Sequence, residues 1–342
     1  MKENIKRLAG CLVTVALIAL GIHGLGILVR PLETDRAYRR IKVFHELPRD
    51  SVEVMIYGSS HAILGVRTME LYDRYGIGAY NYGTSWQKGN TVKLFLRDSL
   101  QTQSPRLAVI ETYLVNNVLR DTDITGEIFL TSYLEDSPAR REYLEQCFGS
   151  DPERWLSYYM PLCAFHENWN SLEQASFLPR AWSGERDSME KVRKNMGFAW
   201  FNRKTPVEVP DPSAVKQKAL GEAALKELDD IMAICRERNI QVLFITVPYD
   251  EGYRYGDAMK AYARENGCGY LNFFELADEI GLDGNTDFWN GNHTNVNGAT
   301  KVADYLGKYI SEHYDLTDMR TVPGNLWDQA NAMEIEGGPG ND

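Results

Sequence analysis

Two residues that lie far apart in the chain have the side-chain types that nucleophilic acyl transfer requires. Ser60 follows a short apolar segment ending in Gly58, and His293 lies near the end of the chain. A serine hydroxyl becomes a nucleophile when a histidine removes its proton. On a tight turn after a strand, the hydroxyl is exposed and the backbone N–H can face a developing oxyanion. The more ordinary interpretation is a serine that caps the following helix.

The segment before Ser60 has the composition of a buried strand. Residues 52–57 read VEVMIY, in which every residue except Glu53 is apolar, and β-branched residues favour strands. A helix is expected from about Thr68. In open α/β sheets, ligands bind beyond the carboxyl ends of the strands. Ser60 therefore lies where such a fold places a site.

Apolar strands and amphipathic helices alternate along much of the remaining chain. Further strands are expected at 79–82, 107–113, 241–247 and 269–274, with helices at 69–75, 91–101, 213–238, 258–266 and 295–313. This alternation predicts a parallel sheet with right-handed crossovers. We therefore expect an α/β fold, a flavodoxin-like three-layer sandwich.

The alternation breaks down between about residues 114 and 212, which we interpret as a helical and irregular insertion. Long insertions in compact domains often form lids or binding elements. Tryptophans in such a region can stack on sugars, although packing in a core is their more common role. Those in this region are Trp155, Trp169, Trp182 and Trp200.

The first thirty residues predict a single membrane anchor. An apolar run from Ala9 to Val29 lies between the basic Lys2, Lys6 and Arg7 and the closing Arg30. At about 1.5 Å per residue it spans roughly 30 Å, the thickness of a hydrocarbon core. A cleaved signal peptide is the alternative, but the run lacks a clear small-residue cleavage site. Basic residues flank both ends, so we favour the simpler orientation, with a short cytoplasmic N-terminus and an extracytoplasmic domain.

The predicted organisation has four parts. They are a membrane anchor at 1–30, a linker at 31–50, an α/β domain at 51–316 that contains the insertion, and a mobile tail at 317–342 rich in Gly, Asn and acidic residues.

The composition argues against several kinds of partner. The 342 residues carry 37 basic and 48 acidic side chains, a net charge of -11, whereas nucleic-acid binding needs concentrated Lys and Arg. The five cysteines contain no CxxC pair, and the histidines show no ligand spacing. We therefore expect no nucleic acid, no metal and no cofactor. Cys11 falls inside the apolar N-terminal run, and we expect the other four cysteines to be free buried thiols rather than disulfide pairs.

Motifs at the predicted strand ends resemble those of the SGNH (GDSL-type) hydrolase superfamily. Residues 58–60 are similar to its first block, with Ser59 where many members have Asp. Gly83 is similar to the second block, and His293 to the histidine of the last block. The resemblance implies that His293 activates Ser60, and that the Ser60 and Gly83 N–H groups hold the oxyanion.

Within that superfamily, the chain resembles membrane-anchored bacterial members related to the D-alanine transfer protein of teichoic acid synthesis. These combine an anchor, a GSS turn, a G-x-x-x-Q segment and an H-x-N-x-x-G ending, which here are residues 58–60, 83–87 and 293–298. An H-x-x-W element of such proteins resembles His166 to Trp169. The resemblance covers about residues 10–310. It implies acyl transfer on a cell-surface glycan, beside a membrane-bound O-acyltransferase as partner.

One departure leaves the acid of the site open. The superfamily usually has Asp three residues before the histidine, where this chain has Asn290. An amide can orient an imidazole but cannot stabilise an imidazolium by charge. Either Asp287 takes that role, or Ser60 and His293 act as a dyad, or catalysis has been lost. In the last case the chain would be a binding or scaffold protein.

Further supporting roles are also open. The third oxyanion donor of the superfamily is an Asn after the third strand, where Asn116 and Asn117 lie without the surrounding GxND block. Gln87 is an alternative side-chain donor. His61 and His166 either contact the substrate or pack as ordinary histidines. An esterase would pass the acyl group to water, and a transferase to a sugar hydroxyl.

Overall fold

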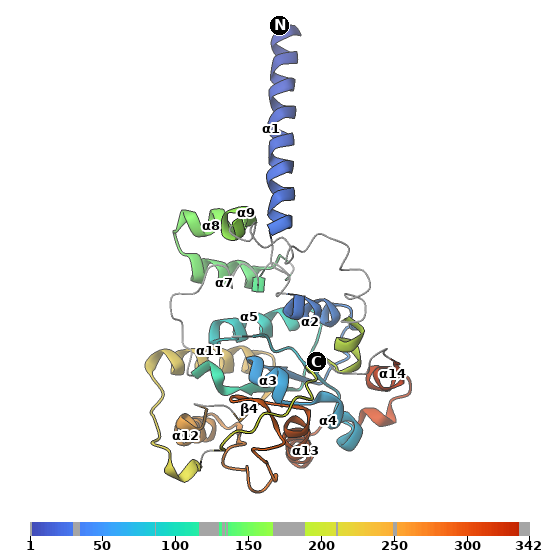
Figure 1. The fold of residues 1–342 in the computed structure, drawn as a ribbon, viewed down its shortest axis with the longest axis vertical. Helices are drawn as coiled ribbons and strands as arrows, with labels where there is room; N and C mark the ends of the chain where they lie inside the picture. The colour runs from blue at the N-terminus through green and yellow to red at the C-terminus, as the bar shows by residue number, and fades with distance from the viewer. Residues whose placement is uncertain are drawn as a thin grey trace. The chain divides into compact units, whose positions relative to one another are not determined.

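The computed structural model describes residues 2–29, 35–85, 87–115, 130–131, 134, 136–166, 189–209, 211–248 and 252–334. The chain divides into two compact units, one of Met1–Tyr38 with Asp121–Arg186 and the other of Arg39–Arg120 with Asp187–Asp342. Figure 1 shows the elements of both. The second unit contains the sheet and the candidate site.

A five-stranded parallel sheet forms the centre of the second unit. Its order is β2-β1-β3-β4-β5, with every neighbouring pair parallel, which is the flavodoxin-like order. The predicted α/β fold is therefore confirmed. The strands are β1 (Val54–Tyr57), β2 (Ala79–Asn81), β3 (Leu107–Glu111), β4 (Gln241–Thr246) and β5 (Gly269–Asn272).

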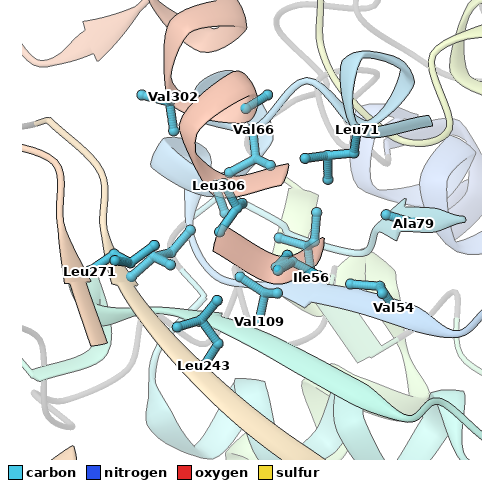
Figure 2. Packing of buried hydrophobic residues seen from close by; sticks show 14 of the residues in the cluster. Val54, Ile56, Val66, Leu71, Ala79, Val109, Leu243, Leu271, Val302 and Leu306 are labelled. Carbon is cyan, nitrogen blue, oxygen red and sulfur yellow. The ribbon is translucent and has the colours of Figure 1, made fainter. Parts of the chain in front are cut away.

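Helices α4 (Thr68–Tyr75) and α13 (Val296–His313) cover one face of the sheet. Alternate strand residues point to this face because side chains in a strand alternate. They form one buried cluster with apolar residues of the two helices, shown in Figure 2. Its members include Val54, Ile56, Leu71, Val109, Leu243, Val302 and Leu306.

The other face is covered by α5 (Gly89–Ser99), α11 (Glu222–Glu237) and α12 (Gly256–Asn266). The Tyr57 hydroxyl of β1 lies 2.7 Å from Ser99 Oγ of α5. Phe244 of β4 lies 6.1 Å from the Tyr262 ring of α12, whose hydroxyl donates to Asp229 of α11. Because both faces are covered, β1 and β3 are buried along their whole length.

Several element boundaries differ from the prediction. A short helix, α3 (Ser60–Gly65), begins directly after the turn, before the expected helix at Thr68. α11 begins at Glu222 rather than at 213, after a 3-10 turn at Pro212–Ala214 and an extended Gly221. The segment between β5 and the last helix, for which no strand was predicted, contains two short antiparallel strands, β6 (Phe288–Asn290) and β7 (His293–Thr294). Other 3-10 helices are η2 (Thr112–Val115), η5 (Gly252–Tyr255) and η6 (Met319–Thr321).

The prediction of a mobile tail is wrong for residues 317–334. Asn325 caps α14 (Leu326–Ala332) by accepting hydrogen bonds from the Trp327 and Asp328 N–H groups. The Trp327 indole is fully buried and donates to the Ala79 carbonyl at 3.1 Å. Burial of this one large apolar ring holds the segment against the domain, although most of its other residues are polar. Residues 335–342 lie outside the described residues.

The predicted linker is also partly wrong, because α2 (Asp35–His45) is a helix. Ile41, Val43 and Phe44 are buried, and the Phe44 ring stacks on Tyr82 at 4.2 Å. The sequence does contain a signal for this helix, because its apolar residues recur at helical spacing among the charged ones.

The first unit contains the predicted anchor and part of the insertion. Within α1 (Lys2–Val29), residues Asn4–Gly26 are long and apolar enough to cross a membrane. The described insertion is helical here, with α7 (Pro138–Phe148), α8 (Pro152–Tyr159) and α9 (Pro161–Phe165). The last part of the insertion belongs to the second unit, where the Asn81 N–H donates to the Met196 carbonyl at 2.9 Å. Trp169 and Trp182 lie outside the described residues.

Candidate active site

Ser60 and His293 meet at the carboxyl edge of the sheet. Ser60 is the first residue of α3, immediately beyond β1, and His293 begins β7. Ser60 Oγ lies 2.8 Å from His293 Nε2, and both side chains are partly buried. A hydroxyl within hydrogen-bond reach of an imidazole nitrogen is the geometry that nucleophile activation needs.

Gly58 makes the turn that presents Ser60. Its φ is +150°, and a Cβ at this position would lie 2.5 Å from the Glu111 Cβ and 2.9 Å from the Ala62 Cβ. Only glycine can therefore bring β1 this close to the end of β3. Ser59 then caps α3, because its Oγ accepts a hydrogen bond from the His61 N–H.

Gln87 supports this turn and is not the predicted oxyanion donor. Its Oε1 accepts a hydrogen bond from the Gly58 N–H at 2.6 Å. Its Nε2 donates to the Tyr82 carbonyl at 3.2 Å and to Thr84 Oγ1 at 3.4 Å, so the amide is occupied by the protein. Gln87 is fully buried. It joins the turn after β1 to the segment after β2.

Of the two predicted backbone oxyanion donors, one is already engaged. The Gly83 N–H donates to Asn81 Oδ1 at 3.2 Å. In the described part of the chain, no group accepts a hydrogen bond from the Ser60 N–H. Ser60 is thus the better backbone candidate. Asn116 and Asn117 lie outside the described residues.

Asn290 orients His293. Its Oδ1 lies 3.0 Å from His293 Nδ1 and also accepts a hydrogen bond from the Asn292 N–H at 3.0 Å. The Asn292 bond requires that the amide oxygen, rather than the nitrogen, faces this way. Because that oxygen only accepts, Nδ1 carries the hydrogen and Nε2 accepts from the Ser60 hydroxyl.

Asp287, the alternative acid, contacts other groups. Its buried carboxylate lies 2.7 Å from Lys301 Nζ and accepts from the Asp283 N–H at 2.8 Å and the Thr286 hydroxyl at 2.9 Å. These contacts anchor the loop before β6 to α13. The geometry therefore places Asn290, rather than Asp287, on the histidine.

Burial lowers the pKa of His293 to about 4. The imidazole is therefore neutral at pH 7, as a general base must be before it accepts a proton. The same burial disfavours the imidazolium that proton transfer creates.

His61 is a packed residue rather than an open substrate contact. Its ring is buried and stacks on the His293 ring, with centroids 4.5 Å apart and planes 11° apart. Its Nδ1 lies 2.8 Å from Ser59 Oγ. Burial, and then the charge of His293, lowers the pKa of His61 to about 3.

Glu111 is a site residue that the sequence analysis missed. It ends β3, is fully buried, and accepts hydrogen bonds from the Ser59 N–H at 3.0 Å and the Ser59 hydroxyl at 2.8 Å. The Tyr113 N–H donates to its other oxygen at 2.6 Å. Burial raises the pKa of Glu111 to about 7, against the effect of these hydrogen bonds. The available signal was an acidic residue at the carboxyl end of an otherwise apolar strand.

His166 ends α9 in the first unit. It is exposed, and its Nδ1 lies 3.1 Å from the Cys163 carbonyl oxygen. This contact fits an ordinary helix-end histidine, and a role in binding stays a prediction. Of the four cysteines outside the N-terminal apolar run, Cys147 and Cys235 are buried free thiols as expected and Cys268 is partly buried, whereas Cys163 is exposed, which corrects the expectation for that residue. Within the described residues, no cluster of three or more His, Cys, Asp or Glu side chains could hold a metal.

Comparisons with known proteins are sparse. No protein-family model matches the chain, and no curated protein matches it. A solved structure of a putative acylhydrolase from Bacteroides fragilis NCTC 9343 is similar in fold, covering 79% of this chain and 93% of its own. The two sequences are 12% identical and the TM-score is 0.38.

Proposed function

We propose that this chain is a serine acyl-transfer enzyme of the SGNH type. The observation that carries the proposal is the continuous hydrogen-bonded arrangement of Ser60, His293 and Asn290 at the carboxyl edge of a flavodoxin-like sheet. A serine whose only role is to cap a helix has no need of an oriented imidazole. The same geometry is the one by which a serine nucleophile is recognised on unrelated folds.

The mechanism follows from the contacts. His293 Nε2 takes the Ser60 proton as Oγ attacks an ester or thioester carbonyl, and the Ser60 N–H donates to the oxyanion. Collapse expels the alcohol or thiol, which takes the proton back from His293. In the second half, His293 removes a proton from water or a sugar hydroxyl, and that oxygen attacks the acyl-enzyme. Collapse then breaks the bond to Ser60 Oγ, which takes the proton back from His293. The acceptor alone distinguishes an esterase from an O-acyltransferase.

The proposed substrate is a cell-surface glycan. Supporting this are the membrane-length helix Asn4–Gly26 and the resemblance to anchored proteins related to the D-alanine transfer protein. In this proposal, the short basic N-terminus stays in the cytoplasm and the α/β domain faces outward. A membrane-bound O-acyltransferase is the proposed partner that supplies or receives the acyl group.

A second candidate is a binding or scaffold protein that keeps the fold without catalysis. Asn290 is the observation that favours it, because an amide gives the imidazolium no opposing charge. On this hypothesis the same glycan or the same membrane partner would be bound, and Ser60 would be dispensable.

A serine-reactive phosphonate probe tests the proposal on the full-length protein in detergent micelles. We expect labelling of the wild type and its loss in both Ser60→Ala and His293→Ala. Ser311→Ala and His313→Ala are the matched controls, since both residues are exposed on α13 and outside the site. They should be labelled like the wild type. A folded wild type that is not labelled, in micelles or in native membranes, would favour the scaffold.

A further inference from the structure

Three buried polar side chains beside the site have no part in the mechanism above. Glu111, Ser59 and His61 are 0%, 1% and 5% exposed, respectively. We call these three residues the Glu111 network. Burying an ionisable carboxyl, a hydroxyl and an imidazole together is unfavourable unless each has hydrogen-bond partners. Here each of the three has such a partner within the network, so they form one connected hydrogen-bonded unit.

The hydrogen bonds of the network run in one direction when Glu111 is ionised. The Ser59 hydroxyl donates its only proton to Glu111 Oε2 at 2.8 Å. Ser59 Oγ can then only accept from His61 Nδ1, which lies 2.8 Å away. With Glu111 ionised, His61 Nδ1 therefore donates to Ser59 Oγ, and the Asn292 backbone is a second hydrogen-bond partner of the ring.

The network ends on the catalytic histidine. The His61 ring lies parallel to the His293 ring at a centroid distance of 4.5 Å, and the Tyr113 ring lies 5.1 Å from His61. His293 is therefore held in its plane by Asn290 and across its face by His61. The geometry provides a continuous path of contacts from the Glu111 carboxylate to the ring that takes the Ser60 proton.

We propose that Glu111, acting through Ser59 and His61, is the positioning residue that supplies His293 with the negative charge its neighbour Asn290 lacks. The inference rests on the proposed function, because it concerns the proton taken from Ser60. His293 becomes positive at that step, and a buried carboxylate nearby stabilises a positive ring more strongly than it would in water. Asn290 sets the tautomer, while the Glu111 network provides the charge.

The protonation behaviour of the network agrees with this role. The pKa of His61 is lowered to about 3, so His61 stays neutral and does not repel the imidazolium. The pKa of Glu111 is raised to about 7. Its charge therefore appears between about pH 6 and pH 8, whereas His293, with a pKa of about 4, is already neutral throughout that range. Among the described residues, the titratable Tyr113 also packs on His61.

The pH dependence of Ser60 labelling tests the inference on the full-length protein. We expect the wild-type rate to rise roughly tenfold between pH 6 and pH 8, a modest share of the effect of a triad acid. Glu111→Gln, and His61→Phe, which keeps an aromatic ring but cannot bond Ser59, should lose this rise. Asp98→Asn is the matched control, because Asp98 is another buried carboxylate of the same unit, bonded to Tyr82 and His45. A rise that survives in folded Glu111→Gln would overturn the inference.

A second measurement does not require labelling. Nitrogen-15 shifts of the histidine rings should show His61 as the Nδ1–H tautomer above pH 7, and both His61 and His293 should respond to a titration near pH 7. Ser59→Ala should abolish that response, although the Ser59 and Tyr113 backbone N–H groups can still hold Glu111. If the wild type is never labelled but the coupling is seen, the proposed catalysis fails and the network stands. If His293 does not respond to Glu111, the network fails whatever the labelling shows.

Discussion

The amide oxygen of Asn290 lies 3.0 Å from Nδ1 of His293, where serine hydrolases place a carboxylate. It orients the ring as a carboxylate would, since it accepts the Nδ1 hydrogen. Asn290 therefore orients His293, as the acid of a triad does, but it carries no negative charge. The position offers a direct test of how much of the activity depends on charge.

Asn290→Asp should raise the reactivity of Ser60. An aspartate keeps the bonds to His293 Nδ1 and the Asn292 N–H and adds a negative charge. We expect the pKa of His293 to rise from about 4, and labelling at pH 7 to accelerate by roughly tenfold or more. Asn290→Ala, which removes the bond as well, should slow it. An Asp variant that labels no faster than the wild type would contradict this prediction, and comparison with Asn290→Asp in the Glu111→Gln background would show whether the Glu111 network already supplies the charge.

Asp287→Asn should separate stability from activity. Because its carboxylate pairs with Lys301 and Asn290 is the partner of His293 Nδ1, the substitution should leave the labelling rate of folded protein within about twofold. Losing the charge leaves Lys301 partly unpaired, and Lys301 is itself partly exposed, so we expect a loss of about 1–2 kcal/mol. Urea denaturation measures the stability. A large fall in labelling with little change in stability would restore Asp287 as the acid.

Gly58→Ala should destabilise the fold at the nucleophile turn. Its φ of +150° and the 2.5 Å approach of a Cβ to Glu111 leave no room for a methyl group. We expect a loss of about 2–4 kcal/mol, from strain and from overpacking together. Gly221→Ala is the control, because nothing lies within 4 Å of a Cβ there and its φ is -74°. The two melting temperatures provide the comparison, and equal values would contradict the prediction.

Trp327→Ala should show that the C-terminal segment is part of the fold. Removing a fully buried indole and its hydrogen bond to Ala79 should lower the free energy of unfolding by about 3–5 kcal/mol. Trp327→Phe keeps most of the apolar volume and should lose less. A Trp327→Ala protein with wild-type stability would mean that α14 contributes nothing to the second unit.

The fold could be predicted because its signals are local and periodic. The strands of the sheet are short, mainly apolar runs separated by helical patterns along much of the chain, and both faces of the sheet are buried, as the runs in β1, β3 and β4 require. The start of α11 and the hairpin of β6 and β7 were missed. Pro212 and Gly221 interrupt the apparent periodicity before α11, and a strand of two or three residues has too short a pattern to detect.

The site could be predicted only in part, because the sequence indicates where strands end but not which partners each side chain contacts. Ser60 and His293 follow recognisable strand ends, so the topology brings them together. The hydrogen-bond donors and acceptors around them depend on distances in the folded protein, which the spacing of residues in the sequence does not reveal. Gln87 and Gly83 have suitable types but point to protein partners, and Glu111 appeared to be an incidental polar residue within a strand.

The buried histidines also predict how stability depends on pH. His61 has a pKa near 3 when folded, against an ordinary value of 6.5, so the unfolded chain binds its proton first as the pH falls. Stability is therefore lost as the pH falls below about 6.5, by about 1.4 kcal/mol at pH 5.5 for this one group. His61→Phe removes that contribution, so relative to the wild type the variant should gain about 1.4 kcal/mol between pH 7.5 and pH 5.5. Any packing change is the same at both pH values and cancels in this difference.

The contribution of Glu111 has the opposite sign, because its pKa is raised to about 7 in the folded protein. Glu111→Gln should therefore make the loss of stability at acid pH steeper. Urea denaturation of the three proteins at the two pH values measures both differences. If the free energy of unfolding changed equally between the two pH values in all three proteins, neither side chain would be held in its uncharged form by the fold.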